Sequence, residues 1–307
     1  MASAISVNHL VKRYGSVTAV NDISFEVASG SLFAFLGANG AGKSTTINCL
    51  NTRLRADGGE LAVAGHRAGA DDDAIRRAIG VVFQTSLLDP LLTVRENLLV
   101  RGRFYGITRG EKARVDELSQ LVDLTSFLDR RYGTLSGGQK RRADIARALI
   151  HNPSVLFLDE PTAGLDPSSR ETVWTAISNL RHDSGLTVFL TTHYMQETER
   201  ADDVCIIDAG RIVATGTPSA LRAKYAHDEL SLTVNRMAEI QRELEAGGYA
   251  VERKVDTLQV KVHSSADAMT LLKRYEADVL DFEFRHGTMD DVFLSLIGPA
   301  NGRSAEA

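Results

Sequence analysis

The stretch SLFAFLGANGAGKS, residues 31–44, joins a short apolar run to a glycine-rich turn and then to a helical pattern. The run Ser31 to Leu36 predicts a buried strand, and Lys43 to Leu50 predicts a helix. The turn between them fits G-x-x-x-x-G-K-[ST], whose glycines let backbone amides converge on phosphate oxygens at the helix N-terminus. We therefore predict a phosphate-binding loop, and a plain glycine-rich turn that starts a helix is the alternative.

Two side chains of this loop have expected roles in binding ATP. Lys43 would hold the β and γ phosphates, and Ser44 would place its hydroxyl on Mg²⁺, as phosphoryl-transfer sites of this class require. Backbone groups of the neighbouring residues would complete the cradle. The predicted ATP-binding residues of the loop are Gly37, Ala38, Asn39, Gly40, Ala41, Gly42, Lys43, Ser44 and Thr45.

A second apolar strand, VLFLDE at residues 155–160, ends in two carboxylates. In a protein with a phosphate loop, this order places Asp159 near Mg²⁺ and Glu160 near the water that attacks the phosphate. Two acids at a strand end could also be ordinary solvated residues. The phosphate loop earlier in the chain favours the functional interpretation.

The pentapeptide LSGGQ, residues 135–139, has two compatible interpretations. Ser136 and Gln139 have the spacing of a capping box, so they could simply start the helix that contains Ile145 and Leu149. A helix N-terminus with two glycines also exposes amides and a positive dipole, which can grip a γ-phosphate.

The order of the predicted elements indicates an α/β protein. Residues 4–27 alternate as early strands with a turn at Asn21 and Asp22, and the sequence from Leu87 to Ile150 is mostly helical. A capping box begins that helical part, with Thr93 followed by Glu96. Apolar strands separated by helices predict a parallel sheet covered on both faces. These strands are residues 155–158, 187–191 and 204–207.

After Pro218 the pattern changes to that of a small α+β domain without a phosphate loop of its own. Its last helix would start at Thr288 with a weak capping box to Asp291. The predicted strands are 230–234 and 258–262, and the predicted helices are 237–245, 266–275 and 288–296. We predict a main domain at 1–225 with a helical subdomain at about 87–150, an accessory domain at 226–298 and a flexible tail at 299–307.

The whole-chain composition of the 307 residues is that of a folded protein, with 43% hydrophobic and 24% charged residues. No run approaches the roughly 20 apolar residues of a membrane span, and the N-terminus does not resemble a secretory signal. The net charge of −5 gives no general reason to bind nucleic acid. Cys49 and Cys205 are expected as buried thiols in a reducing compartment. Lys140, Arg141 and Arg142 are expected on a solvated helix face, and contacts to a partner are the alternative.

In this order, the phosphate loop, LSGGQ, the strand with Asp-Glu and a later lone histidine resemble the ABC ATPase family from Ile5 to about Pro218. The resemblance implies a P-loop NTPase domain with a parallel sheet core, an antiparallel β subdomain and a helical subdomain. It also implies two ATP molecules sandwiched between two nucleotide-binding subunits, each LSGGQ loop capping the ATP of the other. Ser136 and Gly138 would make these contacts in trans, in a loop that also includes Gly137 and Gln139.

The resemblance assigns four further positions. Tyr14 would stack on adenine, although it could be an ordinary strand aromatic. Gln84 would touch Mg²⁺ and the attacking water, and His193 would contact the γ-phosphate; alone, neither residue would carry such an assignment. The loop Ala163 to Asp166 would cross the dimer interface. A helix capped by Ser168 with Glu171 would follow it.

Among ABC proteins, the sequence favours the energy subunit of a transporter. The alternative is a soluble ABC ATPase acting on ribosomes or DNA, but the chain has one motif set and no long coiled coil before LSGGQ. Residues 88–106 and 289–298 resemble the daunorubicin-resistance and nodulation-factor export ATPases, whose permeases are of the ABC-2 type. The resemblance implies export of a drug, antibiotic, lipid or glycan through a separate permease, at the cytoplasmic face of the membrane, with a second and identical subunit as partner. The accessory domain would be a structural cap, a dimer support or a regulatory element.

Overall fold

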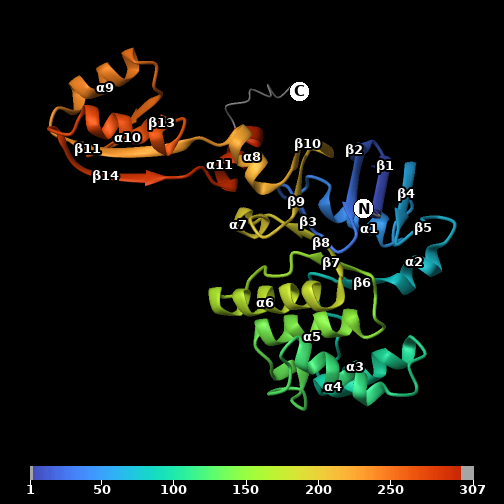
Figure 1. Ribbon diagram of the computed structural model, residues 1–307. Helices are drawn as coiled ribbons and strands as arrows, with labels where there is room; N and C mark the ends of the chain where they lie inside the picture. Colours follow the sequence, from blue (N-terminus) through green and yellow to red (C-terminus); the bar gives the residue numbers. More distant parts are fainter. Residues whose placement is uncertain (1–2, 299–307) are drawn as a thin grey trace. The chain divides into compact units, whose positions relative to one another are not determined.

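The computed structural model describes residues 3–298, apart from the side chains of residues 183 and 184. It forms two compact units, with the boundary between Gly216 and Thr217. Figure 1 shows the elements of both units. The predicted flexible tail at 299–307 lies outside the described residues.

The first unit is built on a six-stranded sheet with the order β10-β9-β3-β8-β7-β6. Five strands run parallel, and β10 pairs antiparallel with β9 at one edge. Every residue of β3 and β8 is buried, as expected for central strands of a parallel sheet. The predicted α/β fold is confirmed. The bounds are β3 Leu32–Leu36, β6 Ile79–Val82, β7 Val155–Asp159, β8 Thr187–Thr192, β9 Asp203–Asp208 and β10 Arg211–Gly216.

An antiparallel sheet packs against this core, with the order β2-β1-β4-β5. Phe25 from this sheet stacks on Phe33 of β3, with ring centroids 5.4 Å apart. The predicted turn at Asn21 and Asp22 is wrong, because both residues lie inside β2 and the chain reverses before it. The pair instead marks an irregularity in the register, where Asp22 has a φ of 57°. The bounds are β1 Ser3–Tyr14, β2 Val17–Ala28, β4 Gly58–Val63 and β5 His66–Arg67.

Helices α3 to α6 lie together in Figure 1 and include the predicted helical subdomain. The capping box of Thr93 and Glu96 is confirmed at the start of α3. The predicted cap at Ser168 is wrong: Asp166 caps α6 by accepting a hydrogen bond from the amide of Ser169, and Pro167 occupies the first helical position. The bounds are α1 Lys43–Leu50, α2 Asp72–Ala78, α3 Val94–Phe104, α4 Glu111–Leu121, α5 Gly137–Leu149, α6 Pro167–Ser184 and α7 Met195–Thr198, with a 3-10 turn at Tyr132–Thr134.

The second unit is an antiparallel sheet with the order β12-β13-β11-β14, and α9 and α10 cover one of its faces (Figure 1). The capping box of Thr288 and Asp291 is present at the start of α11. Helix α8 packs with α11, so it groups with this unit, whereas the predicted boundary at 225/226 placed it in the main domain. The bounds are α8 Pro218–Tyr225, β11 Asp228–Val234, α9 Met237–Ala246, β12 Val251–Arg253, β13 Leu258–Val262, α10 Ser265–Arg274, β14 Val279–Arg285 and α11 Met289–Ile297.

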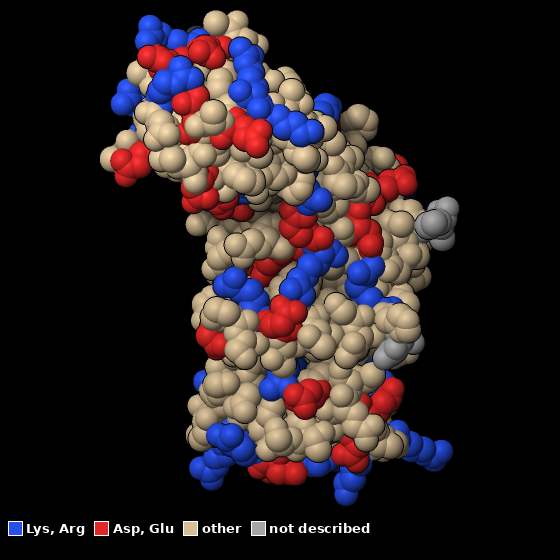
Figure 2. All heavy atoms as spheres, turned by 60° about the vertical axis from the view of Figure 1, so that its left-hand side comes forward, with Lys and Arg blue, Asp and Glu red and all other residues tan. Residues whose placement is uncertain are grey.

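Side chains of both charges are interspersed over the face drawn in Figure 2. Surface ion pairs among the described residues include Arg95 with Asp116 and Asp129, and each such pair contributes only about 0–1 kcal/mol to stability. No helix in residues 3–298 combines the length and apolar character that a membrane crossing needs. Cys49 and Cys205 are buried as predicted, and burial raises the pKa of these thiols to about 11 and about 12.

Candidate nucleotide site

The phosphate loop connects β3 to α1 in a conformation that requires glycine. Gly42 has a φ of 110°, and a Cβ added there would lie 2.6 Å from the carbonyl oxygen of Ala19. A Cβ at Gly37 would lie 2.5 Å from the carbonyl oxygen of Ile207. These positions therefore exclude side chains for steric reasons, so the loop is a built structure and not a chance run of glycines.

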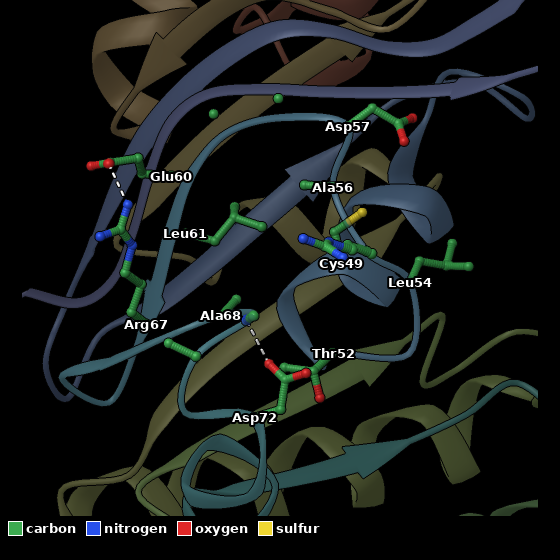
Figure 3. Close-up of a pocket in the computed structure, with 15 residues that line it drawn as sticks. Cys49, Thr52, Leu54, Ala56, Asp57, Glu60, Leu61, Arg67, Ala68 and Asp72 are labelled. Atoms are coloured by element: carbon green, nitrogen blue, oxygen red, sulfur yellow. Dashed lines mark hydrogen bonds and ion pairs between the residues drawn. The ribbon is translucent and has the colours of Figure 1, made fainter.

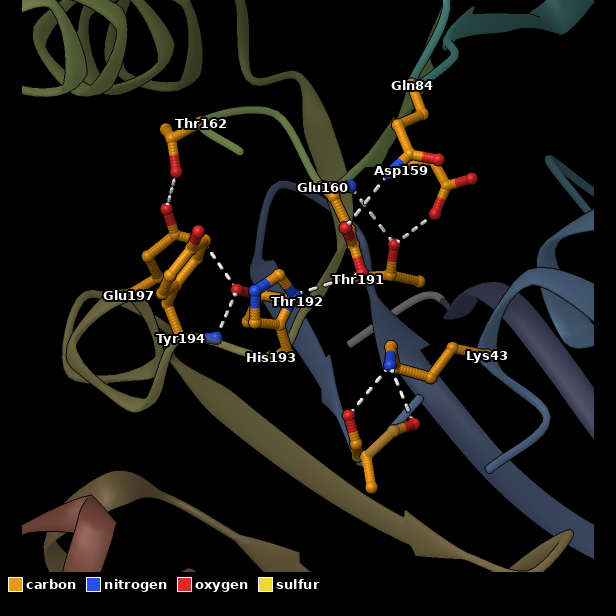
Figure 4. Close-up of polar contacts among 12 residues, drawn as sticks. Lys43, Gln84, Asp159, Glu160, Thr162, Thr191, Thr192, His193, Tyr194 and Glu197 are labelled. Atoms are coloured by element: carbon orange, nitrogen blue, oxygen red, sulfur yellow. Dashed lines mark hydrogen bonds and ion pairs between the residues drawn. The ribbon is translucent and has the colours of Figure 1, made fainter. Parts of the chain in front are cut away.

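Lys43 lies inside the loop and is only 6% exposed. Its Nζ donates to the carbonyl oxygens of Gly37 at 2.7 Å and Ala38 at 3.0 Å, as Figure 4 shows. Burial lowers the pKa of Lys43, while the charges of Glu160 and Asp159 act to raise it. The buried amine is thus held by carbonyls of the loop itself, and a phosphate bound in the loop would replace them as its partner.

The two predicted carboxylates lie at the end of β7 beside β8. Asp159 Oδ1 accepts a hydrogen bond from Thr191 Oγ1 at 2.6 Å, and the amide of Glu160 donates to the Thr191 carbonyl at 3.1 Å. Glu160 has a φ of 47°, in the left-handed region, which costs a non-glycine residue about 1 kcal/mol or more. The surrounding contacts hold this strained residue in place.

Glu160, His193 and Gln84 come together, although they are far apart in the sequence. The His193 ring Nδ1 lies 3.1 Å from Glu160 Oε1, and Gln84 Nε2 donates to Glu160 Oε2 at 3.4 Å (Figure 4). The three residues follow β7, β8 and β6, which are adjacent in the sheet, and the phosphate loop follows β3. The carboxyl ends of parallel strands share one edge, and ligands of such sheets bind there.

The LSGGQ loop lies at the start of α5, and its predicted capping box is confirmed. Ser136 Oγ accepts from the amide of Gln139 at 3.3 Å, and Gln139 Oε1 accepts from the amide of Ser136 at 3.1 Å. Cβ atoms added at Gly137 and Gly138 would meet Leu165 and Ser169. Within residues 3–298, no hydrogen bond joins this loop to the phosphate loop. A hollow of about 170 Å³ opens beside it.

Within residues 3–298, Asp166 and Tyr14 make no hydrogen bond with Glu160, His193 or Gln84. Asp166 caps α6 next to the LSGGQ loop, and its hydrogen bonds with Ser169 lower the pKa of its carboxyl. Tyr14 ends β1 and is 48% exposed, with Lys12 Nζ 5.7 Å from its ring centroid. Both side chains are accessible for contacts outside the chain.

Arg141 is a site residue that the sequence interpretation missed. It was expected on a solvated face, but it is 8% exposed and its guanidinium donates to four backbone carbonyls beside Gln84 and Glu160. The spacing of residues in a helix could have revealed its burial. Arg141 lies one turn before Ile145 and two turns before Leu149, so all three fall on the buried face of α5. The prediction is corrected for Arg141.

Glu197 is a second missed residue. It is 2% exposed and accepts hydrogen bonds from Thr162 and, at 2.6 Å, from Thr192 Oγ1 (Figure 4). It therefore ties the chain just before His193 to the loop that leads to Asp166. A lone glutamate on a short helix gave no sequence signal for this role.

A larger hollow, of about 570 Å³, lies beside the C-terminal end of α1 (Figure 3). Cys49, Thr52, Asp57, Glu60 and Asp72 are among its lining residues, and none of the predicted site residues lines it. Two of its carboxylates are in ion pairs, Glu60 with Arg67 at 2.6 Å and Asp57 with Lys12 at 3.1 Å. The nucleotide site is thus defined by the strand ends and not by this hollow.

A phosphate loop after a buried strand, with a carboxylate pair at the end of another strand of the same sheet, defines a P-loop nucleotide-binding protein. The chain belongs to the ATP-binding proteins of the ABC transporter family and is an ATPase. The model of the family described as "ABC transporter" matches residues 20–163.

The relatives cover almost the whole chain. A daunorubicin/doxorubicin resistance ATP-binding protein of Streptomyces peucetius is 39% identical over 99% of this chain and 95% of its own length. A Nod factor export ATP-binding protein I of Paraburkholderia xenovorans is 39% identical over 96% of this chain and 97% of its own.

Solved structures match more than two thirds of the chain. A dimeric ATP-binding cassette in a post-hydrolysis state, bound to ADP and phosphate, has a TM-score of 0.63 and 27% identity, covering 69% of this chain and 98% of that one. A cbiO1 protein of Clostridium perfringens, part of an ABC transporter complex, has a TM-score of 0.67 and 26% identity, covering 80% of this chain and 96% of that one.

Proposed function

We propose that the chain is the ATP-hydrolysing subunit of an exporter, that it pairs with a second nucleotide-binding subunit, and that it drives a small molecule through a separate membrane permease. The observation that carries the pairing is that, within residues 3–298, no hydrogen bond joins the LSGGQ loop to the phosphate loop. The export direction rests on the full-length relatives, whose names specify drug resistance and Nod factor export.

The phosphate loop would bind ATP through its backbone amides and Lys43. Its residues are Gly37, Ala38, Asn39, Gly40, Ala41, Gly42, Lys43, Ser44 and Thr45. Tyr14 would stack on the adenine, which contributes about 1 kcal/mol. The glycines that exclude side chains and the buried amine fit this ligand, because backbone N–H groups and a lysine amine are the donors that phosphates bind.

Mg²⁺ would be held by Ser44 and Asp159 together with the phosphates, with Gln84 close by. Ser44 is exposed, and Asp159 Oδ2 is left open because only Oδ1 bonds to Thr191. Within residues 3–298, no group of three or more His, Cys, Asp or Glu side chains forms a metal cage. This donor set suits Mg²⁺, which binds through few carboxylates and substrate phosphates and neutralises their charge.

Glu160 would accept the proton of the attacking water, and His193 would position the Glu160 carboxylate and contact the γ-phosphate. Gln84 would orient the same water from the segment after β6, the strand next to β7. The LSGGQ loop would cap the ATP of the second subunit through Ser136, Gly137, Gly138 and Gln139. Asp166 would reach across the dimer interface to the second subunit. Neither subunit would then have a complete site alone.

In the proposed cycle, ATP closes the two subunits, closure moves the permease, and hydrolysis resets both. The chain would work at the cytoplasmic face of the membrane, held there by the permease, as one of two identical copies. Its cargo would be a drug, antibiotic, lipid or glycan. The full-length relatives lend no support to the alternative function on ribosomes or DNA.

Affinity purification of the full-length chain from detergent-solubilised membranes tests the proposed partner. We expect an integral-membrane protein to co-purify and to be identified by mass spectrometry, while a purification with the tag alone recovers none. Recovery of the chain only with ribosomes or DNA would contradict the transporter proposal.

A further inference from the structure

We infer that Arg141 is a positioning residue that couples two ATP sites. One is the site that this subunit carries, and the other is the partner's site, which the LSGGQ loop of this subunit completes. The inference rests on the proposed dimer. It concerns a side chain that touches neither ATP nor Mg²⁺ directly in the assignments above.

The Arg141 guanidinium uses all three of its nitrogens on backbone carbonyls. Nε donates to Pro161 at 2.6 Å, and Nη1 donates to Phe83 at 2.6 Å. Nη2 donates to both Asp159 and Glu160 at 2.8 Å. These acceptors belong to only two segments, which are the ones that carry Gln84 and Glu160.

A second contact from α5 holds the Gln84 segment on its other side. Asp144, one turn after Arg141, accepts hydrogen bonds from Ser86 Oγ at 2.8 Å and from the Tyr132 hydroxyl at 3.0 Å. The segment of Phe83 to Ser86 is therefore gripped at both ends by one helix. Burial lowers the pKa of Arg141, and the charges of Asp144 and Asp159 act to raise it.

The same helix begins at the LSGGQ loop. Ser136 caps α5, and Arg141 follows five residues later, about 7.5 Å along the helix axis. A helix transmits a displacement of its N-terminus along its length, because its backbone hydrogen bonds make it stiff. When LSGGQ engages the phosphate of the partner's ATP, the shift of α5 would reach the backbone of Glu160, whose φ of 47° makes its position depend on such contacts.

Lysine cannot replace this group, although it keeps the charge. The planar fork of arginine directs several donors in fixed directions, whereas an ammonium has one compact donor centre on a flexible chain. Arg141→Lys therefore leaves buried carbonyls at positions 83 and 159–161 without partners. The expected consequence is a less well-positioned Glu160, not a lost ATP-binding loop.

Arg147 provides a matched control on the same helix. It is also 8% exposed, and its Nη2 donates to the carbonyl of Val81 in β6. Within residues 3–298, its hydrogen bond to Val81 and its ion pair with Asp144 do not involve residues 159–161. Arg147→Lys should therefore reproduce the general cost of replacing a buried arginine in α5 without disturbing Glu160.

The test compares ATP turnover by purified full-length wild type, R141K and R147K. For R141K we expect ATP affinity within about twofold of wild type and a kcat about tenfold lower. The Hill coefficient for ATP should fall towards 1, because the two sites no longer influence each other. R147K should retain the wild-type Hill coefficient.

Two outcomes contradict the inference in different ways. If wild type is cooperative and R141K is as cooperative as R147K, Arg141 has only a structural role and the proposed dimer stands. If wild type has a Hill coefficient of 1 and stays monomeric with ATP, the proposed dimer fails, and the link through Arg141 fails with it.

Discussion

Glu160 combines a carboxylate at the centre of the site with a backbone conformation that glutamate rarely adopts. Its φ is 47°, its amide is bound by Thr191, and its carboxylate lies between His193 and Gln84. Strain of this kind persists only where neighbouring contacts fix the residue. The position of the carboxylate is therefore set by the whole strand edge and not by the local sequence.

Glu160→Gln should separate ATP binding from ATP turnover. The amide keeps the shape of the side chain but cannot accept the proton of water, so kcat should fall about 100-fold or more while ATP affinity is kept. Turnover assays and titration with a fluorescent ATP analogue measure the two effects. Glu26→Gln, at an exposed position in β2, is the control. An unchanged rate in Glu160→Gln would exclude Glu160 as the base.

Single residues were predictable where a motif fixes them. The phosphate loop, Asp159 and Glu160 follow from short patterns, and the structure places them at one sheet edge. Arg141 was missed because a basic run usually lies in solvent, and only the period of α5 reveals its burial. Glu197 could not be predicted, since its partners Thr162 and Thr192 come from separate segments.

At the scale of elements, the order of strands explains how distant motifs meet. Strands β3, β8, β7 and β6 lie side by side, so the residues that follow them form one row. Strong apolar runs and capping boxes predicted most of these elements. The short strand β12 and the charged edge strand β14 were missed, because neither has a clear apolar run.

The Asn21-Asp22 pair was misread because a bulge and a turn favour the same residues.

Thr93→Ala should loosen the N-terminus of α3. It removes a hydroxyl that accepts a hydrogen bond from the amide of Glu96, which costs about 1 kcal/mol. Hydrogen exchange of the first-turn amides should accelerate about fivefold, as measured by NMR or mass spectrometry. Ser126→Ala, at an exposed serine between α4 and α5, should leave those rates unchanged. Equal exchange in both variants would show that the cap does not stabilise α3.

At the scale of the whole molecule, we propose that the chain carries two halves of an ATP site. The phosphate loop, Glu160 and His193 would form one half, and the LSGGQ loop at the start of α5 would form the other. The dimeric ATP-binding cassette among the similar structures supports the view that two chains bring such halves together. ATP would then be bound between the two subunits and would hold them together.

The most direct measurement is the mass of the Glu160→Gln protein in solution with and without ATP. The same measurement is then made on variants that carry Glu160→Gln and one further substitution. Glu160→Gln should be a monomer without nucleotide and a dimer with ATP. Adding Ser136→Arg should leave ATP binding intact but abolish the dimer, because the changed loop cannot cap the partner's phosphate. Adding Ser126→Arg instead should preserve it. If the Ser136→Arg protein dimerises with ATP as readily as the Ser126→Arg protein, LSGGQ does not complete the partner's site, and the central claim is wrong.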